Sequence, residues 1–421
     1  MNSATVFGRR AVVEGGQMRN EGTRIEIRDG IIRMVEAAED VIEDEKEKNS
    51  TSRNSGTLLD ADLVIPGFVD IHTHGLGGAA DAVSFWSNPE FTLSRLPRLG
   101  TTSCLATIVF PPSETDSIIA QETRQVLQSL NVAMERPSHG AVLEGIHAEG
   151  PVINDCGALP SSTPNMTLTD FTHLIKLIPR LKIMTISPHL ESQCNYNRLK
   201  TLLDHNVLPA LGHDKVASES SILSALRICP LRRLHITHCF NVSTFHHRNP
   251  SLVNFGLTHC FPNLPRYEGL QPPTVEVIAD LAHIHPLTLQ TMLTVRQYTD
   301  IAIVSDAIHE PIAGKRLKYM GRDLEVSHDC SRVTLVGSDV LAGSCCSLLQ
   351  SFRSLVDVLG VPVGHAACML SETPARIAAL DHVGSIAVGK RADLLLLDSN
   401  LNLEKTIVNG QVIYDSKSSL K

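Results

Sequence analysis

Two histidines separated by one residue, His72 and His74, are the residues of this chain best placed to do chemistry. They follow the apolar segment Phe68 to Ile71, which is predicted to be a buried strand. Alternation along a strand puts both imidazoles on the same side at its carboxyl end, where they could bind a divalent ion. Paired histidines also occur as ordinary core residues, so the hypothesis needs further ligands elsewhere in the sequence.

Further metal-competent residues stand at the ends of other apolar runs. Glu149 follows such a run and precedes a Gly-Pro turn, and Asp306 ends a fully apolar run. His213 and His238 each close a run and are one strand-helix unit apart. Each residue alone could be a helix cap, a core histidine or a solvated carboxylate, but five positions in one context argue against coincidence.

A (β/α)8 barrel would bring these residues together. All of its strands end on one face, so side chains tens to hundreds of positions apart meet in a single cup. Imidazole and carboxylate ligands suit zinc, and an open coordination position would let the ion acidify a water molecule. Asp306, at the end of the last strand, would then lie where a general base is needed.

Several longer motifs occur between about residue 60 and the C-terminus. They are PGFVDIHTHG, Glu149-Gly150-Pro151, GH at 212–213, THCFN with HHR behind it at 237–248, SDA at 305–307, LAGS at 341–344, SETPAR at 371–376 and GSIAVGKRADLLLLD at 384–398. Together they resemble the N-acetylglucosamine-6-phosphate deacetylases of the amidohydrolase superfamily. The last motif alone indicates only an amidohydrolase. THCFN followed by HHR is more specific, because in that family the Asn and Arg hold the sugar phosphate.

The resemblance implies metal-dependent hydrolysis of the N-acetyl amide of N-acetylglucosamine-6-phosphate to glucosamine-6-phosphate and acetate, a step of amino sugar catabolism. Glu149, His213 and His238 would bind the principal ion, which we expect to be zinc. His72 and His74 would hold a second ion or complete the first site, so one or two ions per subunit are expected. The aspartate of the SDA motif would take a proton from water and deliver it to the leaving amine.

The resemblance also implies the substrate contacts. Asn241 and the backbone of Val242 would bind the phosphate, together with His283. Arg248 would reach the same phosphate from the neighbouring subunit, which requires at least a homodimer. The sugar and acyl pocket would be lined by Ala158, Leu341, Ala342 and Gly343.

Three departures from the family pattern fall in the substrate pocket. The family has Gly-Ala-His where this chain has Gly157-Ala158-Leu159, Asp-Gly where it has Asp280-Leu281, and Ala-Pro-Glu where it has Ser187-Pro188-His189. Leu159 offers no hydrogen bond to a substrate oxygen, at a cost of about 1–3 kcal/mol on burial. We therefore expect weak activity on the standard substrate, about tenfold or more below a Leu159→His variant, with His189 as the candidate for partial compensation.

Other functions remain as alternatives. Another N-acyl amino sugar could be the substrate. A cyclic amidase such as a dihydroorotase shares the HxH pair, but it needs a carbamylated lysine where this chain has Glu149. A deaminase of the superfamily would not need the Asn-Arg phosphate contacts. A degenerate, non-catalytic homologue is compatible with the pocket substitutions, but the complete ligand set argues against it.

The strand-end signals divide the chain into two predicted domains of an α/β protein. Residues 66–383 would form the metal-dependent barrel. Residues 1–65, with a hairpin at Asp29-Gly30 and a polar loop at 38–56, and residues 384–421 contain short strand-like segments. Both ends of the chain are therefore expected to build one small β-sandwich domain beside the barrel.

The composition argues against several other classes of protein. A formal net charge of −8 over 421 residues gives no basic surface for nucleic acid. No run approaches about 18 apolar residues, and the N-terminus has no basic patch before an apolar core, so neither a membrane span nor a signal peptide is expected. Ten scattered cysteines without a CxxC pair indicate reduced thiols, and we expect a cytoplasmic enzyme.

Overall fold

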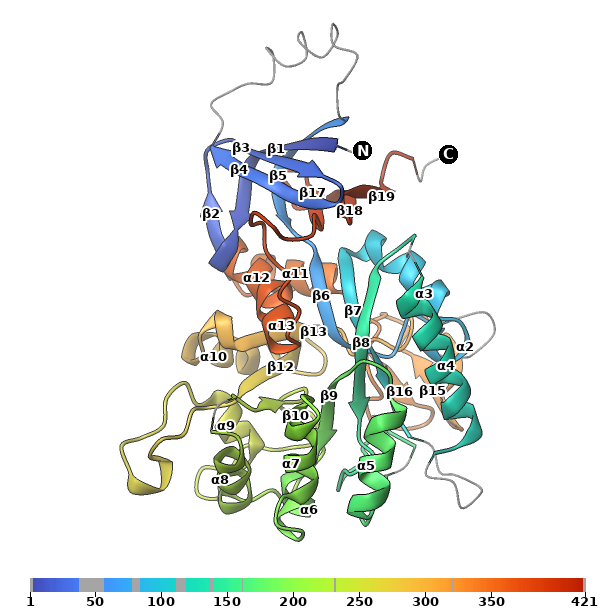
Figure 1. Ribbon diagram of the computed structural model, residues 1–421, viewed down its shortest axis with the longest axis vertical. Coiled ribbons are helices and arrows are strands. Elements are labelled where there is room, and N and C mark those ends of the chain that lie inside the picture. Colours follow the sequence, from blue (N-terminus) through green and yellow to red (C-terminus); the bar gives the residue numbers. More distant parts are fainter. Residues whose placement is uncertain are drawn as a thin grey trace, which may run out of the picture.

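The computed structural model of the chain describes residues 3–37, 57–77, 84–110, 119–136, 139–160, 162–230, 232–319 and 321–418. The polar loop predicted at 38–56 lies outside these ranges. Figure 1 shows a barrel with helices around it and, at one end of the molecule, a sheet beside which both termini of the chain lie.

Eight parallel strands form the barrel, and each pairs with the next in sequence order. They are β6 (Phe68–Thr73), β7 (Thr101–Ile108), β8 (Val142–Glu149), β9 (Leu181–Ile186), β10 (Leu208–Leu211), β11 (His235–Ile236), β12 (Thr274–Ile278) and β13 (Ile301–Val304). Nearly every residue in them is buried, as expected of parallel strands covered on both faces. The predicted α/β barrel is confirmed.

The first and last barrel strands meet at a seam. The backbone N–H of Asp306 donates to the carbonyl of His72, and the N–H of His74 donates to the carbonyl of Ala307, both at 2.9 Å. These two bonds join the carboxyl ends of β6 and β13. Closure of the barrel therefore places the HxH pair directly beside the strand-end aspartate.

Helices surround the barrel, with apolar faces turned toward it. In α4 (Gln121–Glu135) the buried residues include Val126, Leu127 and Leu130, at helical spacing. The helix α11 (Leu348–Arg353) continues directly into a π-helical turn, η5 (Ser354–Val358). The α-helices are α2 (Ser84–Ser87), α3 (Pro89–Arg95), α4 (Gln121–Glu135), α5 (Leu168–Leu177), α6 (Pro188–Ser192), α7 (Asn197–Asp204), α8 (Glu219–Ile228), α9 (Leu252–Leu257), α10 (Pro286–Val295), α11 (Leu348–Arg353), α12 (Val363–Leu370) and α13 (Glu372–Ile377). Short 3-10 turns are η1 (Glu14–Gly16), η2 (Leu96–Leu99), η3 (Pro265–Tyr267) and η4 (Tyr298–Asp300).

Both chain ends contribute strands to one mixed sheet of eight strands, in the order β19-β18-β17-β5-β1-β3-β4, with β2 paired to β1. The two ends join where β17 runs antiparallel to β5. This confirms that a second, strand-rich unit is built from both termini. Its strands are β1 (Ser3–Val13), β2 (Gln17–Arg19), β3 (Thr23–Arg28), β4 (Ile31–Ala37), β5 (Thr57–Pro66), β17 (Leu394–Leu397), β18 (Leu403–Val408) and β19 (Gln411–Asp415).

A small antiparallel sheet is inserted after β13, and the sequence analysis did not predict it. It consists of β14 (Arg316–Tyr319), β15 (Arg322–Val326) and β16 (Val333–Leu335). Its buried side chains share an apolar cluster with Val109, which follows β7, and with Ile153, which follows β8. The inserted sheet therefore packs on the loops at the carboxyl end of the barrel.

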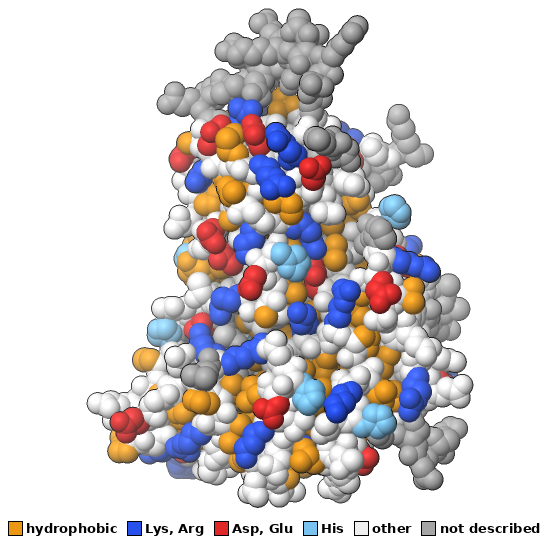
Figure 2. Space-filling view, viewed as in Figure 1, with side chains coloured by type: hydrophobic (Ala, Val, Ile, Leu, Met, Phe, Trp, Pro, Cys, Tyr) orange, Lys and Arg blue, Asp and Glu red, His pale blue; other side chains and the backbone are white. Residues whose placement is uncertain are grey.

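The molecular surface carries charges of both signs. Figure 2 shows Lys and Arg side chains interspersed with Asp and Glu over the face in view. Within the described ranges, no helix has the length and apolarity that a membrane span requires.

Candidate active site and metal centre

Three predicted site residues occupy equivalent positions at strand exits. His213, His238 and Asp306 each lie two residues beyond the end of a barrel strand, β10, β11 and β13. All three have left-handed backbone, with φ of 51°, 24° and 48°. A non-glycine residue in this region costs on the order of 1–3 kcal/mol, and such residues cluster at functional sites. The fold thus maintains an unfavourable conformation at each of these exits.

Three possible ligand atoms converge at one point: Oε1 of Glu149 and the Nε2 atoms of His213 and His238. The Glu149 oxygen lies 2.9 Å from Nε2 of both His213 and His238, and the two nitrogens are 3.1 Å apart. Nδ1 of His213 lies 2.7 Å from the carbonyl oxygen of Asp155, and an N–H donated there would leave Nε2 to bind a cation. A carboxylate and imidazole nitrogens therefore face one point, as the ligands of a cation do.

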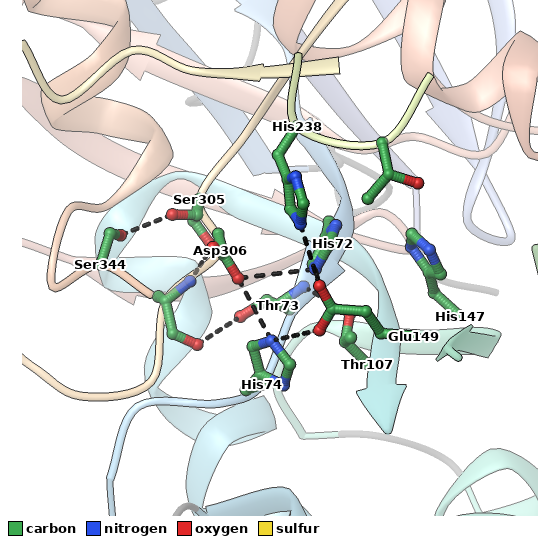
Figure 3. A network of polar contacts seen from close by, with 12 residues as sticks. His72, Thr73, His74, Thr107, His147, Glu149, His238, Ser305, Asp306 and Ser344 are labelled. Carbon is green, nitrogen blue, oxygen red and sulfur yellow. Dashed lines mark hydrogen bonds and ion pairs between the residues drawn. The ribbon is translucent and has the colours of Figure 1, made fainter. Parts of the chain in front are cut away.

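A second set of ligand atoms lies at the other oxygen of Glu149 (Figure 3). Nε2 of His74 is 3.3 Å from Oε2 of Glu149 and 3.2 Å from Oδ1 of Asp306. Nε2 of His72 is 3.5 Å from the same Asp306 oxygen. Oε2 of Glu149 thus faces His74, whereas Oε1 faces His213 and His238 and lies 3.7 Å from Nε2 of His72. The structure brings together all five predicted metal-binding residues and Asp306.

The separations in the cluster fit a divalent ion. Two ligands about 2.0–2.1 Å from a tetrahedral zinc would be about 3.3 Å apart, and the ligand atoms here are separated by 2.9 to 3.7 Å. Nε2 of His72 and Oε2 of Glu149 are buried and have no hydrogen-bond partner. Buried polar atoms left in this way destabilise a fold unless something binds them. A cation between these atoms would satisfy both.

Charges within the cluster keep its carboxylates ionised. Burial by itself would raise the pKa of Asp306, but the positive charge at His72, which a bound cation would supply in place of the ring proton, and a hydrogen bond from His74 outweigh it and hold this pKa below its usual value. In the same way, His72, His213 and His238 outweigh burial and hold the pKa of Glu149 well below its usual value. An ionised Asp306 can accept a proton, as a general base must.

Glu276 belongs to the site and was missed by the sequence analysis. Its side chain on β12 is fully buried and accepts hydrogen bonds from Nδ1 of His72 at 2.6 Å and from the backbone N–H of His238 at 3.1 Å. A carboxylate that binds one nitrogen of an imidazole fixes the ring and leaves the other nitrogen for an ion. The available signal was a lone carboxylate between two valines of the strand 274–278.

Tyr319, on β14 of the inserted sheet, was also missed. Its hydroxyl lies 2.9 Å from Nδ1 of His74, and the side chain is buried. Burial, together with the charges of Glu149 and Asp306, raises the pKa of this phenol well above its usual value, so it remains neutral. No sequence pattern connects a tyrosine in an inserted hairpin with the HxH pair.

A cavity of about 310 Å³ opens beside the ligand cluster. Gly343 has a φ of +71°, and a Cβ there would lie 2.9 Å from the backbone oxygen of Asp306, so this approach requires glycine. Arg248 is exposed and the side chain of His283 is buried, and neither residue belongs to the cavity wall. The predicted substrate-binding residues in the wall are Ala158, Asn241, Val242, Leu341, Ala342 and Gly343.

Leu159 lies in an apolar part of the cavity wall. It is 8 % exposed and shares a hydrophobic cluster with Ile308, Tyr319 and Ala342, which also line the cavity, and with buried residues of the inserted sheet. The side chain thus joins the pocket to the sheet above it. His189, the proposed compensating residue, does not line this cavity, and its ring faces the side-chain amide of Gln193 at 3.1 Å.

The apolar contacts of Leu159 lead to a different prediction for the Leu159→His variant from the gain in kcat/KM expected from the sequence. Imidazole in this apolar cluster would lack a partner, which destabilises the fold by about 1–3 kcal/mol. We predict a lower melting temperature and no gain in kcat/KM on N-acetylglucosamine-6-phosphate. A tenfold gain in kcat/KM at unchanged melting temperature would instead support the loss of a substrate hydrogen bond in the parent.

Comparison with known proteins confirms the resemblance carried by the motifs. The amidohydrolase family model matches residues 264–413. N-acetylglucosamine-6-phosphate deacetylase of Bacillus subtilis (strain 168) is 27% identical over 409 residues, which cover 93% of this chain and 95% of that protein. N-acetylgalactosamine-6-phosphate deacetylase of Escherichia coli O157:H7 is also 27% identical, over 369 residues that cover 85% and 89% of the two chains.

Solved structures share the fold. N-acetylglucosamine-6-phosphate deacetylase of Thermotoga maritima has a TM-score of 0.76 at 23% identity, over 97% of this chain and 98% of that one. A mutant of the Mycobacterium smegmatis enzyme, determined in complex with N-acetyl-D-glucosamine-6-phosphate, has a TM-score of 0.78 at 21% identity, over 98% and 100%. The similarity extends over both the barrel and the sheet of the chain ends.

Proposed function

We propose that this chain hydrolyses the N-acetyl amide of N-acetylglucosamine-6-phosphate to glucosamine-6-phosphate and acetate. The premise is that it is an amidohydrolase related to the N-acetylglucosamine-6-phosphate deacetylases. One observation carries the proposal. Glu149, His213 and His238 converge to within 3.1 Å of one another in the wall of a cavity that also contains Asp306. Ligands for a divalent ion and an ionised carboxylate thus face the same space.

The residues of the cluster support hydrolysis by water. A divalent ion supplies Lewis acidity when bound, which lowers the pKa of a water molecule and polarises an acyl carbonyl. Asp306 accepts the proton from the water and delivers it to the amine nitrogen as the C–N bond breaks. His72 and His74, within 3.5 Å of the Asp306 carboxylate, hold it in place, and Tyr319 fixes the ring of His74.

We assign zinc to the principal site, because zinc binds imidazole nitrogen and carboxylate oxygen in low coordination numbers. Glu149, His213 and His238 would hold this ion. The group formed by His72, His74 and Asp306 would receive a second ion, with Glu149 between the two. Metal analysis of the purified protein measures the number of ions per chain.

The substrate assignment is tested by acetate release. We expect N-acetylglucosamine-6-phosphate to be hydrolysed with a higher kcat/KM than unphosphorylated N-acetylglucosamine, because the pocket would bind the phosphate through Asn241 and the backbone of Val242. N-acetylgalactosamine-6-phosphate is the second candidate substrate, since the Escherichia coli relative, also 27% identical, is named an N-acetylgalactosamine-6-phosphate deacetylase. A higher kcat/KM on this sugar would reassign the substrate. No acetate release from any of the three would contradict the proposed function.

Arg248 is proposed to bind the phosphate from the neighbouring subunit of a homodimer. It is exposed and outside the cavity wall of its own chain, as a residue that acts in a partner would be. Arg248→Ala is expected to raise KM for the phosphorylated sugar by about tenfold, because a charge-assisted hydrogen bond is lost. Equal damage to phosphorylated and unphosphorylated substrates, or a monomer in analytical ultracentrifugation, would contradict this role.

The alternatives are less well supported. A cyclic amidase would need a carbamylated lysine as its bridging ligand, and this chain has the strand-end carboxylate Glu149 instead. We propose residues 66–383 as the catalytic domain and the two chain ends, 1–65 and 384–421, as the second domain. A cytoplasmic location is proposed because all ten cysteines are free thiols.

A further inference from the structure

The cavity wall contains few charges that would favour a phosphorylated substrate. Its carboxylates are Glu149, Asp306 and Asp339, and among the described residues Lys215 is the one Lys or Arg in the wall. Divalent ions would compensate Glu149 and Asp306, which belong to the ligand cluster. A phosphate dianion bound farther out in the cavity would still need a cation, because an unpaired buried charge is strongly disfavoured.

Lys215 is held in place by its backbone while its side chain is nearly free. Its N–H donates to Oδ2 of Asp155 at 2.8 Å. Its Nζ lies 3.8 Å from Oδ1 of the same aspartate, and the side chain is 60% exposed. An exposed ion pair at this distance contributes little to stability, so the ammonium can leave Asp155 for a stronger anion.

Lys215 lies beside the segment proposed to bind phosphate. Ser243, which follows Val242, donates its hydroxyl to the carbonyl of Asp214 at 3.0 Å, in a buried contact. This bond ties the residue before Lys215 to the residue after Val242. A Cβ at Gly157 would lie 3.5 Å from the side chain of Val242, which places the 156–158 loop against the same segment.

We propose that Lys215 is a specificity-determining residue that binds the phosphate of the substrate from within the same chain. The inference rests on the proposed function. Lys215 would place a compact positive charge beside the phosphate oxygens, while Asn241 and the backbone of Val242 provide neutral contacts. Selection of a phosphorylated sugar would then depend on a residue of the same subunit and not only on Arg248 from a partner.

The test compares Lys215→Met, Lys215→Arg and the matched control Lys176→Met, which changes an exposed lysine of α5 outside the cavity. We expect Lys215→Met to lower kcat/KM on N-acetylglucosamine-6-phosphate by about tenfold or more relative to its effect on N-acetylglucosamine. Lys215→Arg should restore most of this ratio, and the control should leave it unchanged. Metal content is measured in every variant, because Lys215 lies two residues from His213.

Binding provides a readout that does not require turnover. In an Asp306→Asn background, calorimetric titration with N-acetylglucosamine-6-phosphate should give a Kd that Lys215→Met raises by about tenfold, at unchanged metal content. An unchanged Kd and an unchanged substrate ratio would overturn the proposal, as would a loss of metal that accounts for the whole effect. Tight, Lys215-dependent binding without acetate release from the parent would support Lys215 as the phosphate ligand and contradict the proposed reaction.

Discussion

Replacing Asp306 by asparagine is expected to lower kcat by roughly 10²-fold or more, because the amide keeps the shape of the carboxylate but cannot accept a proton. The carboxylate is buried and ionised among His72, His74 and Glu149, so its removal acts on chemistry at the ligand cluster. Steady-state kinetics of acetate release measures the effect. Circular dichroism and metal analysis establish that the fold and the principal ion are retained.

The control for this experiment is Asp381→Asn, which makes the same chemical change at an exposed position outside the cavity. Its kcat should equal that of the parent. If Asp306→Asn retained the kcat of the parent while binding metal normally, Asp306 would be a structural carboxylate at the mouth of the barrel and another base would have to be found.

Removing the imidazole of His213 is expected to abolish most metal binding and most activity together. His213 provides one of three atoms that converge to within 3.1 Å, and Nδ1 of its ring is fixed by the carbonyl of Asp155. Loss of one of three protein ligands leaves too few for a stable site. Elemental analysis of the purified His213→Ala protein after dialysis against metal-free buffer measures the loss.

His173→Ala serves as the matched control, because His173 is an exposed histidine of α5. It should bind as much metal as the parent. A His213→Ala protein as metal-loaded as the parent would exclude His213 from the principal site. Retention of about half the metal would indicate that the His72, His74 and Asp306 group holds an ion independently.

Local patterns in the sequence were sufficient to predict the residue types of the site and the fold that brings them together. His72, His74, Glu149, His213 and Asp306 each stand at the end of an apolar run, and this pattern is local enough to be read without coordinates. Parallel strands of a barrel end on one face, so topology alone requires these residues to meet. The terminal strands were predictable for the same reason, since a turn such as Asp29-Gly30 is a local signal.

The contacts among these residues could not be predicted in this way, because they depend on how distant segments pack. Glu276 binds His72 across 204 positions, and Tyr319 binds His74 across 245 positions. Contacts of this kind depend on barrel closure and on where the inserted sheet packs, neither of which leaves a periodic signal in the chain. The same holds for Leu159, which the family pattern identified as a lost hydrogen bond and which the inserted sheet converts into part of an apolar cluster. Local pattern specifies elements and their ends, whereas distances between side chains are set by packing among segments far apart in the sequence.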